Sequence, residues 1–363
     1  MDTAPSLTPS LVNLTCPLPL TEKERIVLGH GAGGKLTAAL IAELFQPAFH
    51  NPTLDRLDDQ AVLALPGAPA HAGGRLALTT DSFVVTPIFF PGGDIGSLAV
   101  HGTVNDLAMG GARPLWLAAA FILEEGLAQA DLRRIVASMA EAARAAGVEI
   151  VTGDTKVVNH GKGDQIFITT TGVGWVPEGV HLSSNQARPG DRILVSGTIG
   201  DHGMAILSQR EGLAFEEPIL SDSAALHTLA AAVVAAAGGQ LRCLRDPTRG
   251  GLATALHEIA ERSEVGMLLE EKHIPVRELV HSACELLGID PLFVANEGKL
   301  VAIVAPEAAA AALAALRAHP LGENACLVGE VRSEHPGMLM LRTEVGGTRV
   351  LDTLFHEQLP RIC

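Results

Sequence analysis

The sequence has no tyrosine, and aromatic residues make up only 3% of its 363 residues. Its formal net charge is -15, because acidic residues outnumber basic ones. Nucleic-acid binding normally needs a basic surface and aromatic platforms for the bases, so this composition argues against a nucleic-acid partner. A small anionic substrate would need local cations or Mg2+ in its site, because the field of the whole protein repels it.

Long apolar runs and targeting features are also lacking. The longest apolar runs, residues 115–123 and 229–237, are well short of the roughly 20 residues that a membrane-spanning helix needs. The first residues lack the basic region and the apolar core of a secretory signal. We therefore expect no membrane segment and a cytoplasmic protein.

The cysteines do not form a recognisable framework. There are five of them, widely spaced and without a Cys-x-x-Cys pair, so neither disulfides nor a zinc cluster is expected. The last, Cys363, is the final residue, whereas a prenylation signal places its cysteine four residues from the end. Two interpretations remain: an incidental residue at a frayed end, or a reachable and reactive thiol.

The composition of the segment before Cys363 predicts that it can move and can also pack against a protein surface. It begins with Gly346 and Gly347, which can act as a hinge, and large apolar residues follow. The chain from Gly347 to Cys363, fully extended, reaches on the order of 50 Å. The thiol is therefore able to reach a distant pocket or a second protein, and Arg361 is a nearby cation that would favour the thiolate.

A glycine-rich sequence, GHGAGGK at residues 29–35, precedes a predicted helix over residues 35–45. Main-chain amides of such a loop approach a phosphate closely, and the helix directs its positive end toward the same place. The sequence is not the GxxxxGK[ST] loop, so a glycine-rich turn without a ligand is an equally common interpretation.

Acidic residues recur at the ends of predicted strands and helices. An aspartate in such a place is often a turn residue or a helix cap. Several of them beside a phosphate loop are what a Mg-nucleotide site requires, because Mg2+ takes carboxylate and phosphate oxygens. Lys35 and Lys156 would supply further cations. The acids are Asp59 before a strand over residues 61–63, Asp81 after a strand from residue 75, Asp106 in a helix over 97–109, Asp154 after a strand over 148–152, and Asp246 before a helix over 252–261.

The second half of the chain is predicted to form another domain. Residues 177–189 are polar and turn-rich, so we place the boundary there and divide the chain into an arm (1–25), a first domain (26–180), a second domain (181–345) and a tail (346–363). Helices are predicted over residues 222–237, 276–287 and 307–319, with strands over 192–196 and 300–304. Glu297, at a turn beside Lys299, is either a surface acid or a catalytic base.

The motifs GHGAGGK, VTGDTKVV, LRDPTRGG and NEGKLV, with the ending LPRIC, resemble the HypE family of carbamoyl dehydratases, which act in [NiFe]-hydrogenase maturation. The resemblance covers nearly all of residues 26–363 and extends to the superfamily of aminoimidazole ribonucleotide synthetase and selenophosphate synthetase. It implies an α+β fold of two domains. The N-terminal sheet would pair across a homodimer, the C-terminal domain would pack helices on a sheet, and a flexible tail would carry Cys363.

The resemblance also implies an activity and its partners. HypF would transfer a carbamoyl group to Cys363, and ATP would activate the amide oxygen. Loss of phosphate and a proton would leave a thiocyanate, whose cyanide goes to iron on a HypC-HypD complex. Glu297 would take the amide proton and Lys156 would offset negative charge. The candidate ATP-binding residues are Gly33, Gly34, Lys35, Asp59, Asp81, Asn105, Asp106, Asp154, Asp246 and Arg249, and the five aspartates would also hold Mg2+.

Two alternatives stay open. One is a small-molecule kinase or synthetase of the same superfamily, in which the terminal cysteine is incidental. Selenophosphate synthetases usually carry a reactive cysteine or selenocysteine in the glycine-rich loop, and GHGAGGK has none. The other is a nucleotide-sensing scaffold that docks partners through its tail, although several acidic strand ends favour an active Mg2+ site over a sensor.

Overall fold

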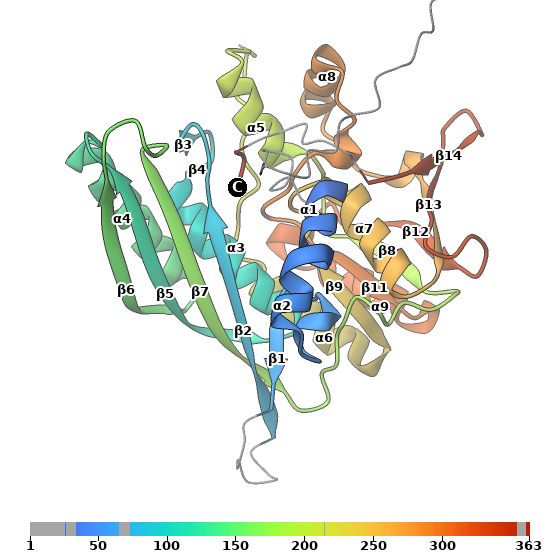
Figure 1. Cartoon of the computed structure of the whole chain (residues 1–363). Coiled ribbons are helices and arrows are strands. Elements are labelled where there is room, and N and C mark those ends of the chain that lie inside the picture. The colour runs from blue at the N-terminus through green and yellow to red at the C-terminus, as the bar shows by residue number, and fades with distance from the viewer. Residues whose placement is uncertain (1–25, 27–33, 65–72, 214, 354–360) are drawn as a thin grey trace, which may run out of the picture.

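The computed structural model describes residues 26, 34–64, 73–213, 215–353 and 361–363. Each half of this chain builds one large sheet, and helices pack beside and between the two sheets (Figure 1). The arm over residues 1–25, Cys16 and Gly33 lie outside the described residues, so the expectations for them are not addressed below.

The first sheet has five strands in the order β1-β2-β7-β5-β6. Only β5 and β6 pair in parallel, and the other neighbours are antiparallel. Burial alternates residue by residue along β7, which means that one face of the sheet is packed and the other is open. The strands are β1 (Ala61–Leu63), β2 (Gly74–Phe83), β5 (Arg113–Glu124), β6 (Glu149–Val158) and β7 (Ile166–Pro177).

Two helices cover the packed face of this sheet, α3 (Ile95–Met109) and α4 (Gln129–Ala145). A small hairpin of β3 (Phe89–Phe90) and β4 (Gly93–Asp94) leads into α3. Asp94 caps the helix by accepting hydrogen bonds from the amides of Gly96 and Ser97, at 2.8 and 3.0 Å. The helix is buried on nearly all sides, which fixes its C-terminal turn, with Asn105 and Asp106, between the two halves.

The second sheet has seven strands in the order β14-β13-β10-β12-β8-β11-β9. Every residue of its inner strand β11 is buried, because α7 packs on one face and α6 and α9 pack on the other. The strands are β8 (Arg192–Val195), β9 (Leu241–Arg245), β10 (Gly266–Glu270), β11 (Val301–Val304), β12 (Cys326–Arg332), β13 (Leu339–Arg342) and β14 (Thr348–Leu351). The helices are α5 (Asp201–Arg210), α6 (His227–Ala237), α7 (Gly251–Arg262), α8 (Glu278–Leu287) and α9 (Pro306–Arg317).

Some predicted elements differ from the observed ones. The helix predicted over residues 222–237 begins only at His227, and residues 221–226 are not helical, because their polar groups bond to other segments. Residues 348–351, which we assigned to the tail, form β14 at the edge of the second sheet. Asp81 and Asp154 lie within β2 and β6, not after them.

The N-terminal helix is continuous but changes its winding. It runs as α1 (Lys35–Leu40), a π-helical turn (Ile41–Phe45) and α2 (Gln46–Phe49), so the helix predicted over residues 35–45 is longer than expected. None of the helices in the described ranges is long and apolar enough to cross a bilayer.

Candidate functional site

A small cavity of about 30 Å³ lies between the two halves, next to the C-terminus. Its lining residues come from β2 and α3, from the segment between β9 and α7, from the turn before β11 and from the C-terminus. The lining includes six of the sequence-predicted site residues and four others. The lining residues are Asp81, Ser82, Phe83, Gly102, Asp106, Asp246, Thr248, Arg249, Glu297 and Cys363.

The carboxylates at this cavity share a buried, negatively charged environment. Burial, followed by the charges of Asp81 and Asp246, raises the pKa of Asp106 well above its ordinary value, although the Thr79 hydroxyl donates to Asp106 Oδ2 at 2.7 Å. Burial also raises the pKa of Asp246 to about 7, and the charge of Asp59 adds to this effect. The cluster therefore binds protons in the absence of a cation.

Asp59 extends the acidic cluster toward the N-terminal helix. Burial raises the pKa of Asp59 to about 6, opposed by the Arg245 guanidinium 3.0 Å away. It does not line the cavity at Cys363 but a neighbouring one of about 410 Å³, between the N-terminal helix and the second half. Arg245, Glu258 and Arg262 line that cavity too.

The acidic cluster fits a divalent cation that arrives with a phosphate ligand. Within the described ranges, no group of three or more His, Cys, Asp or Glu side chains is arranged to hold a metal ion by itself. Mg2+ usually takes only one or two carboxylates and completes its shell with water and phosphate oxygens. Buried carboxylates with raised pKa values, such as Asp106 and Asp246, are the donors that such an ion would stabilise in their charged form.

Glu297 is the most enclosed acid at the cavity, with 2% of its surface exposed. Burial, followed by the charges of Asp246 and Asp81, raises the pKa of Glu297 well above its ordinary value. Its Oε1 is buried without a hydrogen-bond partner in the described structure. An unpartnered carboxyl oxygen beside a cavity is available to a ligand, because leaving it unsatisfied costs about 1–3 kcal/mol.

The main chain of Glu297 is held on both sides. Its N–H donates to Asp222 Oδ1 at 3.0 Å, and its carbonyl accepts from Ala224 N–H at 3.3 Å. Asp222 also forms an ion pair with Lys299 at 3.0 Å, and both side chains are almost fully buried. From the sequence, neither Asp222 nor Lys299 is assigned to the site, because Asp222 falls in the helix predicted over residues 222–237 and Lys299 is noted only as a neighbour of Glu297.

Asn105 also contacts this main chain. We call the contacts that Asp222, Ala224, Lys299 and Asn105 form around Glu297 the bracket. Its side-chain amide donates to the carbonyls of Ala224 and Glu297, at 3.0 and 3.2 Å, and its oxygen accepts from Leu226 N–H at 2.7 Å. Both donors and the acceptor are thus used inside the protein. The geometry gives Asn105 a role in holding Glu297 and adds no support to the prediction that it contacts ATP.

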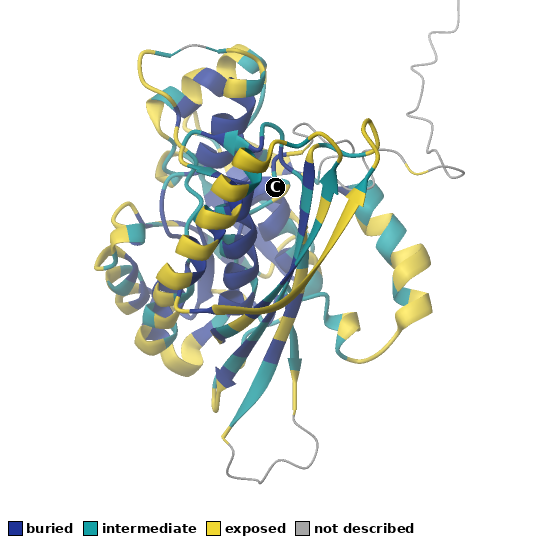
Figure 2. Ribbon diagram, turned by 90° about the vertical axis from the view of Figure 1, so that its left-hand side faces the viewer, coloured by how far each residue is buried: buried dark blue, intermediate teal, exposed yellow. Residues whose placement is uncertain are grey.

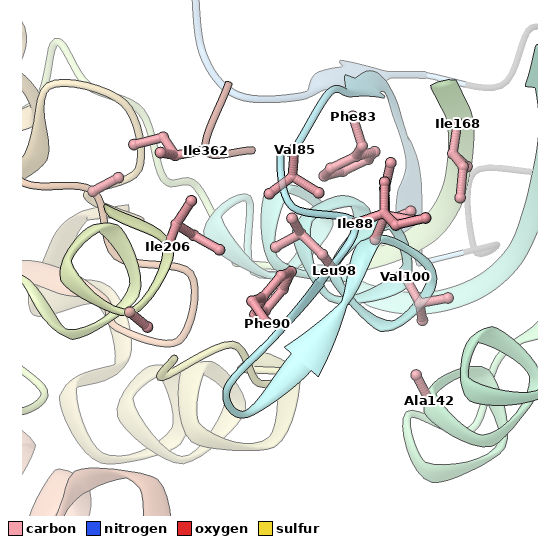
Figure 3. Close-up of a cluster of buried hydrophobic side chains, with 14 of the residues drawn as sticks. Phe83, Val85, Ile88, Phe90, Leu98, Val100, Ala142, Ile168, Ile206 and Ile362 are labelled. Atoms are coloured by element: carbon pink, nitrogen blue, oxygen red, sulfur yellow. The ribbon is translucent and has the colours of Figure 1, made fainter. Parts of the chain in front are cut away.

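The last three residues are docked against the strand extension that follows β2. Val84 N–H donates to Cys363 O at 3.0 Å, Thr86 N–H donates to Arg361 O at 3.1 Å, and Val85 pairs with Ile362 as an antiparallel bridge. Ile362 enters the apolar core (Figure 3). Cys363 packs at the border of the same core and lines the cavity. The predicted reactive cysteine therefore lies beside Glu297, Asp106 and Asp246.

The two described residues of the predicted phosphate loop, Gly34 and Lys35, lie away from this cavity. Gly34 is the N-cap of α1, and Lys35 forms a 2.5 Å ion pair with Asp352, which stands at the base of the tail. Neither residue lines the cavity that Cys363 lines. Whether they contact phosphates stays a prediction.

Asp154 and Lys156 are separated from the cavity within one chain. They pair with each other at 2.8 Å on β6, where both side chains are exposed, and neither lines the cavity. Residues two apart in an extended strand point to the same face, which accounts for this pairing. Three strand spacings, roughly 14 Å, separate β6 from β2 with its Asp81.

Two family models cover most of the chain. The N-terminal domain of AIR synthase related proteins matches residues 57–176, and the C-terminal domain of the same family matches residues 188–340. The carbamoyl dehydratase HypE of Azotobacter vinelandii is 61% identical over 334 residues, which is 92% of this chain and 96% of that protein. The Escherichia coli protein of the same name is 49% identical over 338 residues, 93% and 99% of the two chains.

Comparison with solved structures points to the same family as the sequence comparisons. A HypE chain from a HypE-HypF complex superposes with a TM-score of 0.81 at 50% identity, covering 87% of this chain and all of that one. A HypE structure in complex with ATP superposes with a TM-score of 0.77 at 52% identity, covering 93% of this chain and all of that one. The fold predicted from the sequence resemblance, α+β with two domains, is confirmed.

Proposed function

This chain belongs to the carbamoyl dehydratase HypE family of AIR synthase related proteins, and from that premise we propose that it dehydrates a carbamoyl group carried on its own Cys363. The observation that carries the proposal is the docked C-terminus, which places Cys363 at one buried cavity with Glu297 and the acidic cluster. A kinase or a sensor would have no use for a terminal thiol in that place.

The proposed reaction converts a thiocarbamate into a thiocyanate. The C–O bond of the carbamoyl group breaks, both N–H protons leave, and a C≡N bond forms on the same sulfur. The family relative solved with ATP supports ATP as the second substrate, which supplies the phosphoryl group that turns the amide oxygen into a leaving group. Mg2+ bound among Asp81, Asp106 and Asp246 would balance the phosphate charges.

The chain's own residues would handle protons and exclude water. Glu297 is buried at the cavity with one carboxyl oxygen unsatisfied, so it can accept the amide proton once a cation has lowered its pKa. Arg249 lines the same cavity and offers positive charge. Enclosure matters because water would hydrolyse an activated carbamoyl group.

We propose the carbamoyltransferase HypF as the donor, because a HypE relative is solved in complex with HypF. The docked thiol lines a cavity of about 30 Å³, which has no room for a donor or acceptor protein, so the tail must leave the cavity to receive its carbamoyl group and again to release its product. The product would be a cyanide ligand for iron held by a HypC-HypD complex. This acceptor rests on the family assignment alone.

We also propose a homodimer formed through the first sheet. Its edge strand β6 is exposed along almost its whole length (Figure 2), and it carries Ile150, Val151 and Val157 in exposed positions. A long apolar edge is normally covered, since it otherwise promotes aggregation. Asp154 and Lys156 lie on this strand, so a dimer would bring them toward a partner's site.

Intact-mass spectrometry tests the proposed function. Protein treated with HypF, a carbamoyl donor and ATP should gain a carbamoyl group on Cys363 and then lose one water. Cys363→Ala should gain nothing, whereas Cys326→Ala, which removes the other partly exposed thiol of the described chain, should behave as wild type. Labelling of Cys363→Ala at the wild-type level would refute the assignment.

A further inference from the structure

The docked end of the chain is recognised through its main chain. Main-chain oxygens of Arg361, Ile362 and Cys363 each accept a hydrogen bond from the body of the protein. The groups that hold these residues come from the segment after β2, from α5 and from Asp164 before β7. They contact main-chain oxygens, the Ile362 side chain and the Arg361 guanidinium.

His202, on the first turn of α5, forms a hydrogen bond with the Ile362 carbonyl oxygen. Its Nε2 lies 2.5 Å from Ile362 O, and its Nδ1 lies 2.8 Å from Ser221 Oγ. The carbonyl only accepts, so Nε2 must carry a proton. Burial lowers the pKa of this imidazole, which leaves Nδ1 bare and makes Ser221 the donor to it. The ring is fully buried and meets the edge of Phe90 at 5.6 Å between centroids, so its orientation is fixed.

Arg210, the last residue of α5, binds the carbonyl oxygen of Arg361. Its Nη2 donates to Arg361 O at 2.8 Å and to Thr86 O at 2.7 Å, so it spans the tail and the strand on which the tail lies. Its Nε donates to Thr86 O as well, at 3.0 Å. Arg361 itself forms a 3.1 Å ion pair with Asp164.

Ile362 provides the side-chain part of the contact. It is 3% exposed and belongs to the apolar cluster with Val85 and Ile206, both visible beside it in Figure 3. Burial of this isoleucine side chain favours docking of the short segment. Cys363 packs against the same cluster and also lines the cavity.

We propose that His202 and Arg210 are positioning residues of a tail clamp, formed with Val84–Thr86, that holds the terminal residues by their main-chain oxygens and by Ile362. The contacts that these clamp residues make go to main-chain oxygens and to the Ile362 side chain, so they hold the tail alike as a thiol, as a thiocarbamate and as a thiocyanate. Every chemical state of Cys363 is thus delivered to the same position. The purpose of the clamp rests on the proposed dehydration, but its existence does not.

The clamp is adjacent to the bracket that holds Glu297. Ser221, which orients His202, immediately precedes Asp222, whose carboxylate accepts the Glu297 N–H. The Ser221 amide in turn donates to Pro91 O at 2.8 Å, which ties this segment to the first half of the chain. One short segment therefore sets the position of the tail relative to the candidate base.

Hydrogen exchange at the Val84 and Thr86 amides tests the clamp without any substrate, because these groups donate to the tail. Cys363→Ser should exchange as slowly as wild type. Ile362→Ala and Arg210→Met should exchange faster by about tenfold, the scale of one lost buried contact. Arg188→Met, an exposed arginine outside the clamp, is the matched control. Equal acceleration by Cys363→Ser and Ile362→Ala would overturn the proposal, as would no acceleration in either clamp variant.

His202 is tested by a conservative pair. A glutamine amide nitrogen can take the place of Nε2 and donate to Ile362 O, whereas leucine cannot. We expect His202→Leu to accelerate exchange and to slow dehydration of carbamoylated Cys363 by about tenfold, with His202→Gln restoring most of both. If neither variant folds, Arg210→Met and Ile362→Ala decide alone. Failure of wild type to dehydrate, with exchange protection intact, would refute the proposed function and leave the clamp standing.

Discussion

Asp222 Oδ1 accepts the main-chain N–H of Glu297 at 3.0 Å, and its other oxygen pairs with Lys299 at 3.0 Å. The two contacts fix the turn that presents Glu297 to the cavity. Asp222→Ala removes both and leaves Lys299 buried without its partner, so we expect dehydration to slow at least tenfold. Asp222→Asn keeps an acceptor for the Glu297 amide and should retain more activity.

The measurement for Asp222 is single-turnover dehydration of protein that HypF has already charged, followed by mass spectrometry. Charging itself should be unaffected, because it takes place on the undocked tail. Equal dehydration rates in wild type and Asp222→Ala would show that the bracket does not position the base.

Glu297→Gln should trap the carbamoyl adduct. The amide keeps the size of the carboxyl group but cannot accept a proton, and proton transfer to a positioned base typically contributes 10²–10⁴-fold. Mass spectra should therefore show S-carbamoyl Cys363 persisting in the presence of ATP. Normal loss of water in Glu297→Gln would remove Glu297 from the mechanism.

Gly298→Ala tests how tightly the same turn is packed. A Cβ at Gly298 would lie 1.7 Å from Asp222 O, a contact with main chain that no side-chain movement relieves. We expect a loss of several kcal/mol in the free energy of unfolding, or displacement of Glu297 with loss of dehydration. Gly239→Ala has nothing within 4 Å and is the matched control. Chemical denaturation of both variants gives the comparison.

The sequence predicted the participants of the site better than their arrangement. Motif resemblance led to the fold, whereas Cys363, Glu297 and the five aspartates stand out by their positions along the chain before any resemblance is considered. It did not reveal the bracket of Asp222 and Lys299, because the polar residues before α6 continue a helical pattern. It also missed His202 and Arg210, since a histidine and an arginine on a helix do not reveal that a distant chain end lies against them.

Asp246 makes the stability of the nucleotide-free protein depend on pH. Its pKa is raised to about 7 in the folded state, against an ordinary value of 3.8, so the folded protein binds this proton more tightly than the unfolded chain. The resulting stabilisation is complete below about pH 4 and is lost as pH rises through 7. Wild type should therefore unfold more easily at pH 8 than at pH 6.

Asp246→Asn should remove much of that dependence. The amide carries no charge at any pH, so we expect the variant to be more stable than wild type at pH 8 by more than about 1 kcal/mol, the scale of one pKa unit. Glu141→Gln, on the exposed side of α4, is the control. Thermal unfolding at both pH values, with and without Mg2+ and ATP, gives the comparison. A variant less stable than wild type at pH 8 would contradict the prediction.

In the proposed dimer, the edge strand β6 of the first sheet would bring Lys156 toward the reaction site of the partner. Val151 is 58% exposed on β6, and a charge there would oppose burial against a second copy. Val151→Glu should shift the protein toward monomer in sedimentation velocity. Val350→Glu, at a 54% exposed position on β14 at the edge of the other sheet, should not.

Mixed dimers then separate action within one chain from action across the interface. Lys156→Ala and Cys363→Ala should each be inactive alone. If Lys156 serves the partner's tail, mixing the two variants restores dehydration, because the mixed dimer pairs an intact Cys363 with an intact Lys156 from the other chain. Absence of restoration, with dimers formed, would place both residues in one chain. The roughly 14 Å that separates β6 from β2 argues for restoration.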